Sequence, residues 1–195
     1  MNKNRLEAFS DGVLAIIITI MVLEIKLPET ANLLGLKLLL PTLISYILSF
    51  ALIGVYWNNH HHLLQSLKKV NSAIMWSNLN LLFWLSLVPF GTKWMGETHF
   101  DRFTVISYSV LLIICGLSYN VLQNKIAFSM RNDINRLTKI IKKQNYKVWI
   151  STLCNIISIP AAFINVQISL ILFTISSGIW IIPSKEIEEE LSKSI

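Results

Sequence analysis

Five long runs of this sequence contain no charged residue, and they limit the folds that the chain can adopt. The runs lie at 12–23, 38–67, 70–92, 103–124 and 148–184. A helix needs about 20 residues to cross the roughly 30 Å hydrocarbon core of a bilayer, so most of these runs are long enough. Charged residues make up only 14% of the chain, against about 25% in an ordinary soluble domain. The sequence therefore predicts an all-α, polytopic membrane protein.

The last of these runs is too long for a single helix and is predicted to form two. Asn165 and Gln167 lie near its middle, shortly after Pro160, and predict a tight turn there. The chain is then one domain, residues 1–195, with six transmembrane helices. The predicted spans are 6–27, 41–63, 72–94, 103–123, 147–164 and 167–183.

The positive charges predict how these helices are oriented. Thirteen of the 17 Lys and Arg residues lie on one side of the predicted topology, together with both termini. Because cytoplasmic loops carry an excess of these residues, both termini of this inner-membrane protein are predicted to be cytoplasmic. The most basic stretch, 125–147, is predicted to form an amphipathic helix on the cytoplasmic membrane surface. Membrane lipid then accounts for the net charge of +6, and no nucleic-acid partner is needed.

The first polar cluster lies at the start of the first span. Its members are Arg5, Phe9, Ser10, Asp11 and Gly12. An ionisable residue inside a span costs at least about 2.5 kcal/mol on insertion scales, so Asp11 needs a polar partner or contact with water. A helix cap with both charges near the lipid headgroups would also explain the pattern. The residues alone leave both interpretations open.

A second polar cluster lies near the end of the second span, at His60, His61 and His62. Adjacent side chains on a helix point about 100° apart, so these three imidazoles cannot all bind one metal ion, and no metal site is predicted. We expect an imidazole or the Asn59 amide to form a hydrogen bond across the bundle. In the third span, Asn80 needs partners for the same reason.

A stripe of four side chains runs along the first span: Ile16, Thr19, Ile20 and Leu23. At 100° per residue all four share one helix face. In a single helix such a stripe is expected to face lipid or the protein core.

Taken together, these residues resemble a known family. Arg5, Phe9, Ser10, Asp11 and Gly12 match the R-x-x-x-F-S-D-G signature of the transmembrane protein 175 family of endolysosomal potassium channels and their prokaryotic relatives. Residues similar to the second and third helices of that family are Trp57, Asn59, His60, His61, Asn80, Pro89, Phe90, Thr92, Gly96 and Glu97. The resemblance is dense over 5–97, and after that it rests on the number of helices.

The resemblance implies a potassium-selective, leak-like channel in which the first helix of each subunit of a homotetramer lines the pore. In that family Ile16 and Leu23 match hydrophobic constriction residues, and Thr19 matches a hydroxyl layer linked to selectivity. Ile20 stands on the same face, where some relatives have leucine. Permeant potassium is the expected ligand, without a cofactor. The Arg5, Ser10 and Asp11 cluster would tie the first helix to the second and third.

The sequence agrees with part of this implication. It has no T-V-G-Y-G loop to supply a carbonyl filter and no span with an arginine at every third position. A pore would have to be built from helix side chains, and rings at Ile16 and Leu23 would lie about 10.5 Å apart along the helix. The alternative is a proton-coupled or metal-ion transporter that uses Asp11 and the His60–His62 cluster. An enzyme is not predicted, because no H-E-x-x-H or G-x-S-x-G motif occurs.

Overall fold

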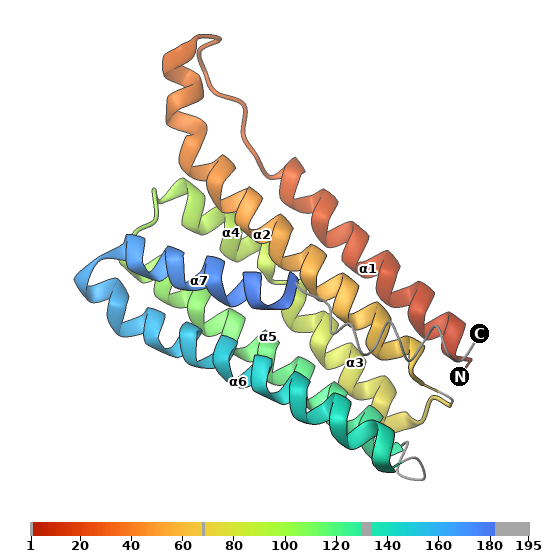
Figure 1. Ribbon diagram of the computed structural model, residues 1–195. Coiled ribbons are helices and arrows are strands. Elements are labelled where there is room, and N and C mark those ends of the chain that lie inside the picture. Colours follow the sequence, from red (N-terminus) through yellow and green to blue (C-terminus); the bar gives the residue numbers. More distant parts are fainter. Residues whose placement is uncertain (1, 68, 130–133, 182–195) are drawn as a thin grey trace.

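The described part of the protein is all-α, and it matches the predicted fold class. A computed structural model describes residues 2–67, 69–129 and 134–181; side chains are described except at 134–145 and 181. The helices in these ranges are α1 (Lys3–Leu23), α2 (Leu33–Gln65), α3 (Ser72–Leu85), α4 (Val88–Glu97), α5 (Arg102–Ser129), α6 (Ile134–Ile164) and α7 (Val166–Ile181) (Figure 1).

Five of these segments are long and apolar enough to cross a membrane. They are α1, α2, the α3–α4 pair, α5 and the 146–164 part of α6. The sixth segment, α7, is apolar but has only 16 residues. The predicted turn before α7 is present, because Asn165 Oδ1 accepts a hydrogen bond of 2.8 Å from the Gln167 amide. The prediction of a polytopic, all-helical membrane protein is confirmed.

The second and third spans differ from their predicted boundaries. The helix α2 begins eight residues early, at Leu33, because Asn32 caps it by accepting from the Gly35 amide at 2.9 Å. The third span is broken at Ser86, after which α4 begins with Pro89 in its first turn. Proline has no amide hydrogen to continue the ladder of α3, so a break at this position has a direct cause.

The basic stretch 125–147 is not a separate surface helix. Its first residues end α5 at Ser129, and α6 runs without interruption from Ile134 into the membrane-spanning part. Residues 130–133 lie outside the described ranges. The prediction of an independent amphipathic helix is therefore wrong, because both flanking spans simply extend beyond their uncharged runs.

The helices run roughly side by side, and their order places α1 at one edge of the bundle (Figure 1). The start of α1 lies beside the end of α2, where Lys3 Nζ donates to the Gln65 carbonyl at 2.7 Å. At the other end of α1, Glu24 pairs with Lys93 of α4, and Lys26 pairs with Glu97 at 2.8 Å. Polar contacts thus hold α1 at both ends against α2 and α4.

Candidate pore helix and its polar contacts

The helix α1 has one buried face and one exposed face. The buried face consists of Leu6, Ser10, Leu14, Ile17 and Met21, spaced three or four residues apart. The apolar members join the hydrophobic core of the protomer. Because this spacing keeps side chains on one side of a helix, the opposite face of α1 is left without cover from the described part of its own chain.

The predicted stripe lies on the exposed face. Ile16 is 58% exposed, Ile20 is 40% exposed and Leu23 is 81% exposed. The hydroxyl of Thr19 donates to the Ile16 carbonyl at 2.9 Å, so its oxygen lone pairs are left for other partners. The stripe is therefore not part of the core of a single protomer.

A buried chain of hydrogen bonds fixes the opposite face of α1 to α2 and α3. His60 Nε2 lies 2.7 Å from Asn78 Oδ1, and the Asn78 amide donates to Ser10 Oγ at 2.9 Å. The Ser10 hydroxyl then donates to the Leu6 carbonyl at 2.8 Å. If His60 Nε2 carries the proton, each member donates to the next, and the chain ends on a backbone oxygen.

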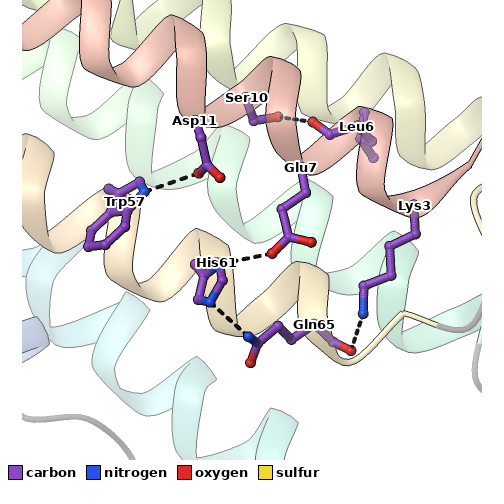
Figure 2. Close-up of polar contacts among 8 residues, drawn as sticks. All are labelled: Lys3, Leu6, Glu7, Ser10, Asp11, Trp57, His61 and Gln65. Carbon is purple, nitrogen blue, oxygen red and sulfur yellow. Dashed lines mark hydrogen bonds and ion pairs between the residues drawn. The ribbon is translucent and has the colours of Figure 1, made fainter.

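Beside this chain, three contacts of α1 side chains join α1 to α2, one to a backbone carbonyl and two to side chains, and we call them the rungs of a ladder (Figure 2). The first rung is the bond from Lys3 to the Gln65 carbonyl. In the second, Glu7 Oε1 lies 2.9 Å from His61 Nδ1, a short contact that is not aligned as a hydrogen bond. In the third, Trp57 Nε1 donates to Asp11 Oδ1 at 3.0 Å.

The spacing of the ladder follows from helix geometry. Its members on α1 are four residues apart, at 3, 7 and 11, and those on α2 are four apart, at 57, 61 and 65. Side chains at this spacing lie above one another on the same helix face, so two antiparallel helices can pair them in order. A further contact joins the side chains of Gln65 and His61 at 2.7 Å.

The predicted polar cluster is only partly brought together. Ser10 and His60 meet through Asn78, and His61 meets Glu7. Arg5, Phe9 and Gly12 instead lie on the exposed side of α1, and in the described part of the chain the Arg5 guanidinium has no hydrogen bond or ion pair. Asp11 binds Trp57 rather than Arg5 or a histidine.

Two predicted amides hold other helices together. Asn59 donates to the Val55 carbonyl at 2.8 Å and to the Trp180 carbonyl of α7 at 3.3 Å. Asn80 donates to Ser118 Oγ of α5 at 3.0 Å. Both side chains therefore point away from α1, toward the half of the bundle that contains α5 and α7.

Sequence analysis missed Glu7 as a member of the site. The regular spacing of Lys3, Glu7 and Asp11 was the available signal, because it repeats every four residues. Sequence analysis also missed a second buried chain, in which Thr92 donates to Ser49 at 2.7 Å and Ser49 lies 2.7 Å from the Tyr108 hydroxyl. This chain joins α4, α2 and α5.

Metal binding receives no support from this arrangement. Among the described residues, no three His, Cys, Asp or Glu side chains are grouped so that they could hold a metal ion. The His60 ring is occupied by Asn78, and the His61 ring lies between Glu7 and Gln65. The arrangement instead holds one face of α1 against the protomer and leaves the face of Ile16 and Leu23 exposed.

Comparison with known proteins places this helix in a family. Residues 5–89 match the family model described as endosomal/lysosomal potassium channel TMEM175. A Chryseobacterium protein named potassium channel HX13_20290 is 45% identical over the full length of both chains. A Streptomyces collinus protein named potassium channel B446_29190 is 36% identical over 63% of this chain and 64% of its own length.

A solved structure agrees with the sequence matches. The crystal structure of a lysosomal potassium-selective channel TMEM175 homolog from Chamaesiphon minutus superimposes with a TM-score of 0.76 at 26% identity. The match covers 91% of this chain and 95% of that one. With this agreement in fold and a relative of equal length at 45% identity, the chain belongs to the TMEM175 family.

Proposed function

We propose that this chain is a potassium channel whose pore is lined by α1 in a homotetramer. The observation that carries the proposal is the exposure of Ile16, Thr19 and Leu23 on α1 while the opposite face is fastened to the protomer. A helix that only filled the core would bury its apolar side chains. Potassium as the ion is supported by the bacterial relatives, which are named potassium channels, and by the solved homolog, which is described as potassium-selective. These proteins are described as channels, not enzymes.

Four copies of the exposed face would form a pore of alternating character. Ile16 and Leu23 would contribute apolar rings, which exclude water from a narrow passage and hold it closed or poorly conducting. Thr19 lies between them, and because its hydrogen is given to the Ile16 carbonyl, its oxygen would face the passage as an acceptor. The Thr19 oxygens would then be the polar groups that a partly dehydrated cation contacts between the apolar rings of Ile16 and Leu23.

The ladder and the buried chain would set the rotation of α1. The polar contacts of Ser10, Glu7 and Asp11 all lie on the sides of α1 that do not carry the stripe. Each contact restrains the helix from turning about its axis. The proposed role of these polar residues is structural: they keep Ile16 and Leu23 directed at the symmetry axis.

Membrane placement is also part of the proposal. The chain would lie in the plasma membrane of a prokaryote, surrounded by lipid, with both termini cytoplasmic. Lys3 lies at the end of α1 that this topology places in the cytoplasm, beside the end of α2. The excess of positive charge on that side supports the assignment.

Flux measurements test the channel directly. Purified protein would be reconstituted into liposomes loaded with potassium or with sodium, and ion efflux would be followed with and without a proton ionophore. A potassium channel releases potassium faster than sodium, and the rate rises when the ionophore dissipates the membrane potential that efflux builds. Flux that requires a proton gradient in the opposite direction would identify a coupled transporter and contradict the proposal.

A further inference from the structure

A cavity with a partly polar lining lies inside the protomer, between α2, α5, α6 and α7. Its volume is about 40 Å³, and its lining includes Asn59, Tyr119, Asn155 and Ser176. Each of the four helices contributes at least one of these residues. None of the described lining residues comes from α1, so the cavity is separate from the exposed stripe.

The side-chain oxygen of Asn155 points to a ligand in this cavity. Asn155 is only 6% exposed, and in the part of the protein that the structure describes its Oδ1 has no hydrogen-bond partner. A bilayer offers no water to a buried acceptor, and leaving one unpaired is unfavourable. A molecule in the cavity that donates a hydrogen bond would remove this cost.

Several other polar groups of the lining are already using their hydrogens. The Asn59 amide donates to two backbone carbonyls, and the Ser151 hydroxyl donates to the Val148 carbonyl at 3.0 Å. The Ser176 hydroxyl donates to the Ser151 carbonyl at 3.3 Å. Asn155 Oδ1 is left as an acceptor, and the described lining contains no charged residue. The fitting ligand is neutral and carries a donor.

A second cavity of about 80 Å³ adjoins the first. The two share Leu52, Leu112 and Ser177, which form the boundary between them. Met95 and Phe173 are among the mostly apolar residues that line the second cavity. An engineered cavity of about 150 Å³ in another protein binds benzene. The two cavities together have a similar volume, so they can hold a molecule of a few heavy atoms.

We propose that the two cavities form one binding site for a small neutral amphiphile, such as a short-chain alcohol. Its hydroxyl donates to Asn155 Oδ1, and its alkyl chain passes Leu52 and Leu112 toward Phe173. The site lies away from the stripe of α1, and it exists whether or not α1 lines a pore.

Photolabelling tests the site without relying on ion flux. The full-length protein in liposomes is irradiated with a diazirine analogue of 1-hexanol, and the labelled peptides are mapped by mass spectrometry. Label is expected on peptides that contain Asn155 or Phe173, and excess 1-hexanol should compete it away. Hexane should compete less, because it cannot donate to Asn155. Equal competition by hexane would overturn the recognition of a hydroxyl.

Three variants make the test specific. In Asn155→Leu, label at the cavity should fall about fivefold, the loss that one hydrogen bond accounts for. A side chain added at Gly178 meets nothing within 4 Å, so Gly178→Val should fill the apolar cavity and also reduce the label. Gly54 has the same open space but lines neither cavity, and Gly54→Val is the matched control. Label that all three variants leave unchanged would place the alcohol in bulk lipid and refute the site.

Discussion

The indole of Trp57 donates a hydrogen bond of 3.0 Å to the carboxylate of Asp11, and this bond joins α2 to α1 beside the exposed face (Figure 2). Asp11 is the one acidic residue in the family signature of this chain. Its partner is a neutral donor, so the pair holds α1 in place without an opposite charge. A substitution that removes the charge of Asp11 but keeps an oxygen acceptor can therefore separate the role of the hydrogen bond from the role of the charge.

Removing the carboxylate should weaken assembly more than it changes conduction. Asp11→Ala deletes the acceptor of the Trp57 indole, and we expect a loss of about 1 kcal/mol in a contact that is partly exposed. Asp11→Asn keeps an oxygen for the indole and should lose less. The measurement is the thermal midpoint and yield of the assembled protein in detergent. If Asp11→Ala assembles normally but conducts differently per channel, the carboxylate belongs to the ion path instead.

A double-mutant cycle would show that the two residues act as a pair. Trp57→Phe keeps most of the ring and removes the donor. If the bond is what matters, the combined Asp11→Ala and Trp57→Phe variant should be no less stable than the worse single variant. Additive losses would mean that each side chain acts through other contacts.

The buried chain through Asn78 should be more sensitive than the ladder. In Asn78→Leu the new side chain has a similar size, but His60 and Ser10 lose the partner that they share inside the bundle. We expect a loss of about 2–4 kcal/mol, since each abandoned buried group costs about 1–3 kcal/mol. Ser10→Ala leaves one Asn78 hydrogen without an acceptor and should cost less, about 1–2 kcal/mol. Unfolding in detergent by guanidinium would measure both, and equal losses would argue against a continuous chain.

Helical periodicity predicted the stripe of α1, but it could not predict the partners of the polar side chains. The face of Ile16 and Leu23 follows from 100° per residue within one helix. The partner of Asp11 depends on the rotation of α2 against α1, and a small change in that rotation would exchange Trp57 for a neighbouring side chain. That rotation is decided by packing over the whole interface, which no local pattern contains.

Boundary errors have a different cause. The predicted spans were placed on the uncharged runs, but α2 begins before Lys37, at Leu33, because the Asn32 cap and a run of leucines favour helix there. In the same way α6 extends back to Ile134 through a basic stretch. An uncharged run predicts which part of a helix lies in the hydrocarbon core, but it does not predict where the helix begins and ends.

Topology can be checked with a reporter. A fluorescent protein fused after Ile195 should fold and emit light in the cytoplasm, because thirteen Lys and Arg residues lie on the side of the termini and four on the other. Alkaline phosphatase at the same position should be inactive. A second fusion in the loop at Pro28, on the opposite side, should give the reverse pattern. Active phosphatase after Ile195 would mean that α7 does not cross the membrane.

The last prediction concerns Ile16, on which the channel proposal depends. If four copies of Ile16 form a dry ring, Ile16→Asn places four amides where water was excluded, and the barrier to ions should fall. Potassium flux should rise several-fold, and selectivity over sodium should drop, because a hydrated ring lets sodium pass with more of its water shell. Thr19→Val deletes a hydroxyl and should change mainly selectivity.

A control on the same helix separates a pore from a lipid-facing surface. Ile18 is unsuitable because it packs against the core. Val22 is 47% exposed and lies about 120° round the helix from Ile16. In a pore, Val22→Asn should leave flux per assembled channel unchanged. If α1 simply faced lipid, both variants would put an amide into hydrocarbon, lower expression equally and leave the remaining flux and its selectivity unchanged. Potassium and sodium flux per reconstituted channel decides between these outcomes, and matching behaviour of the two variants would show that α1 does not line a pore.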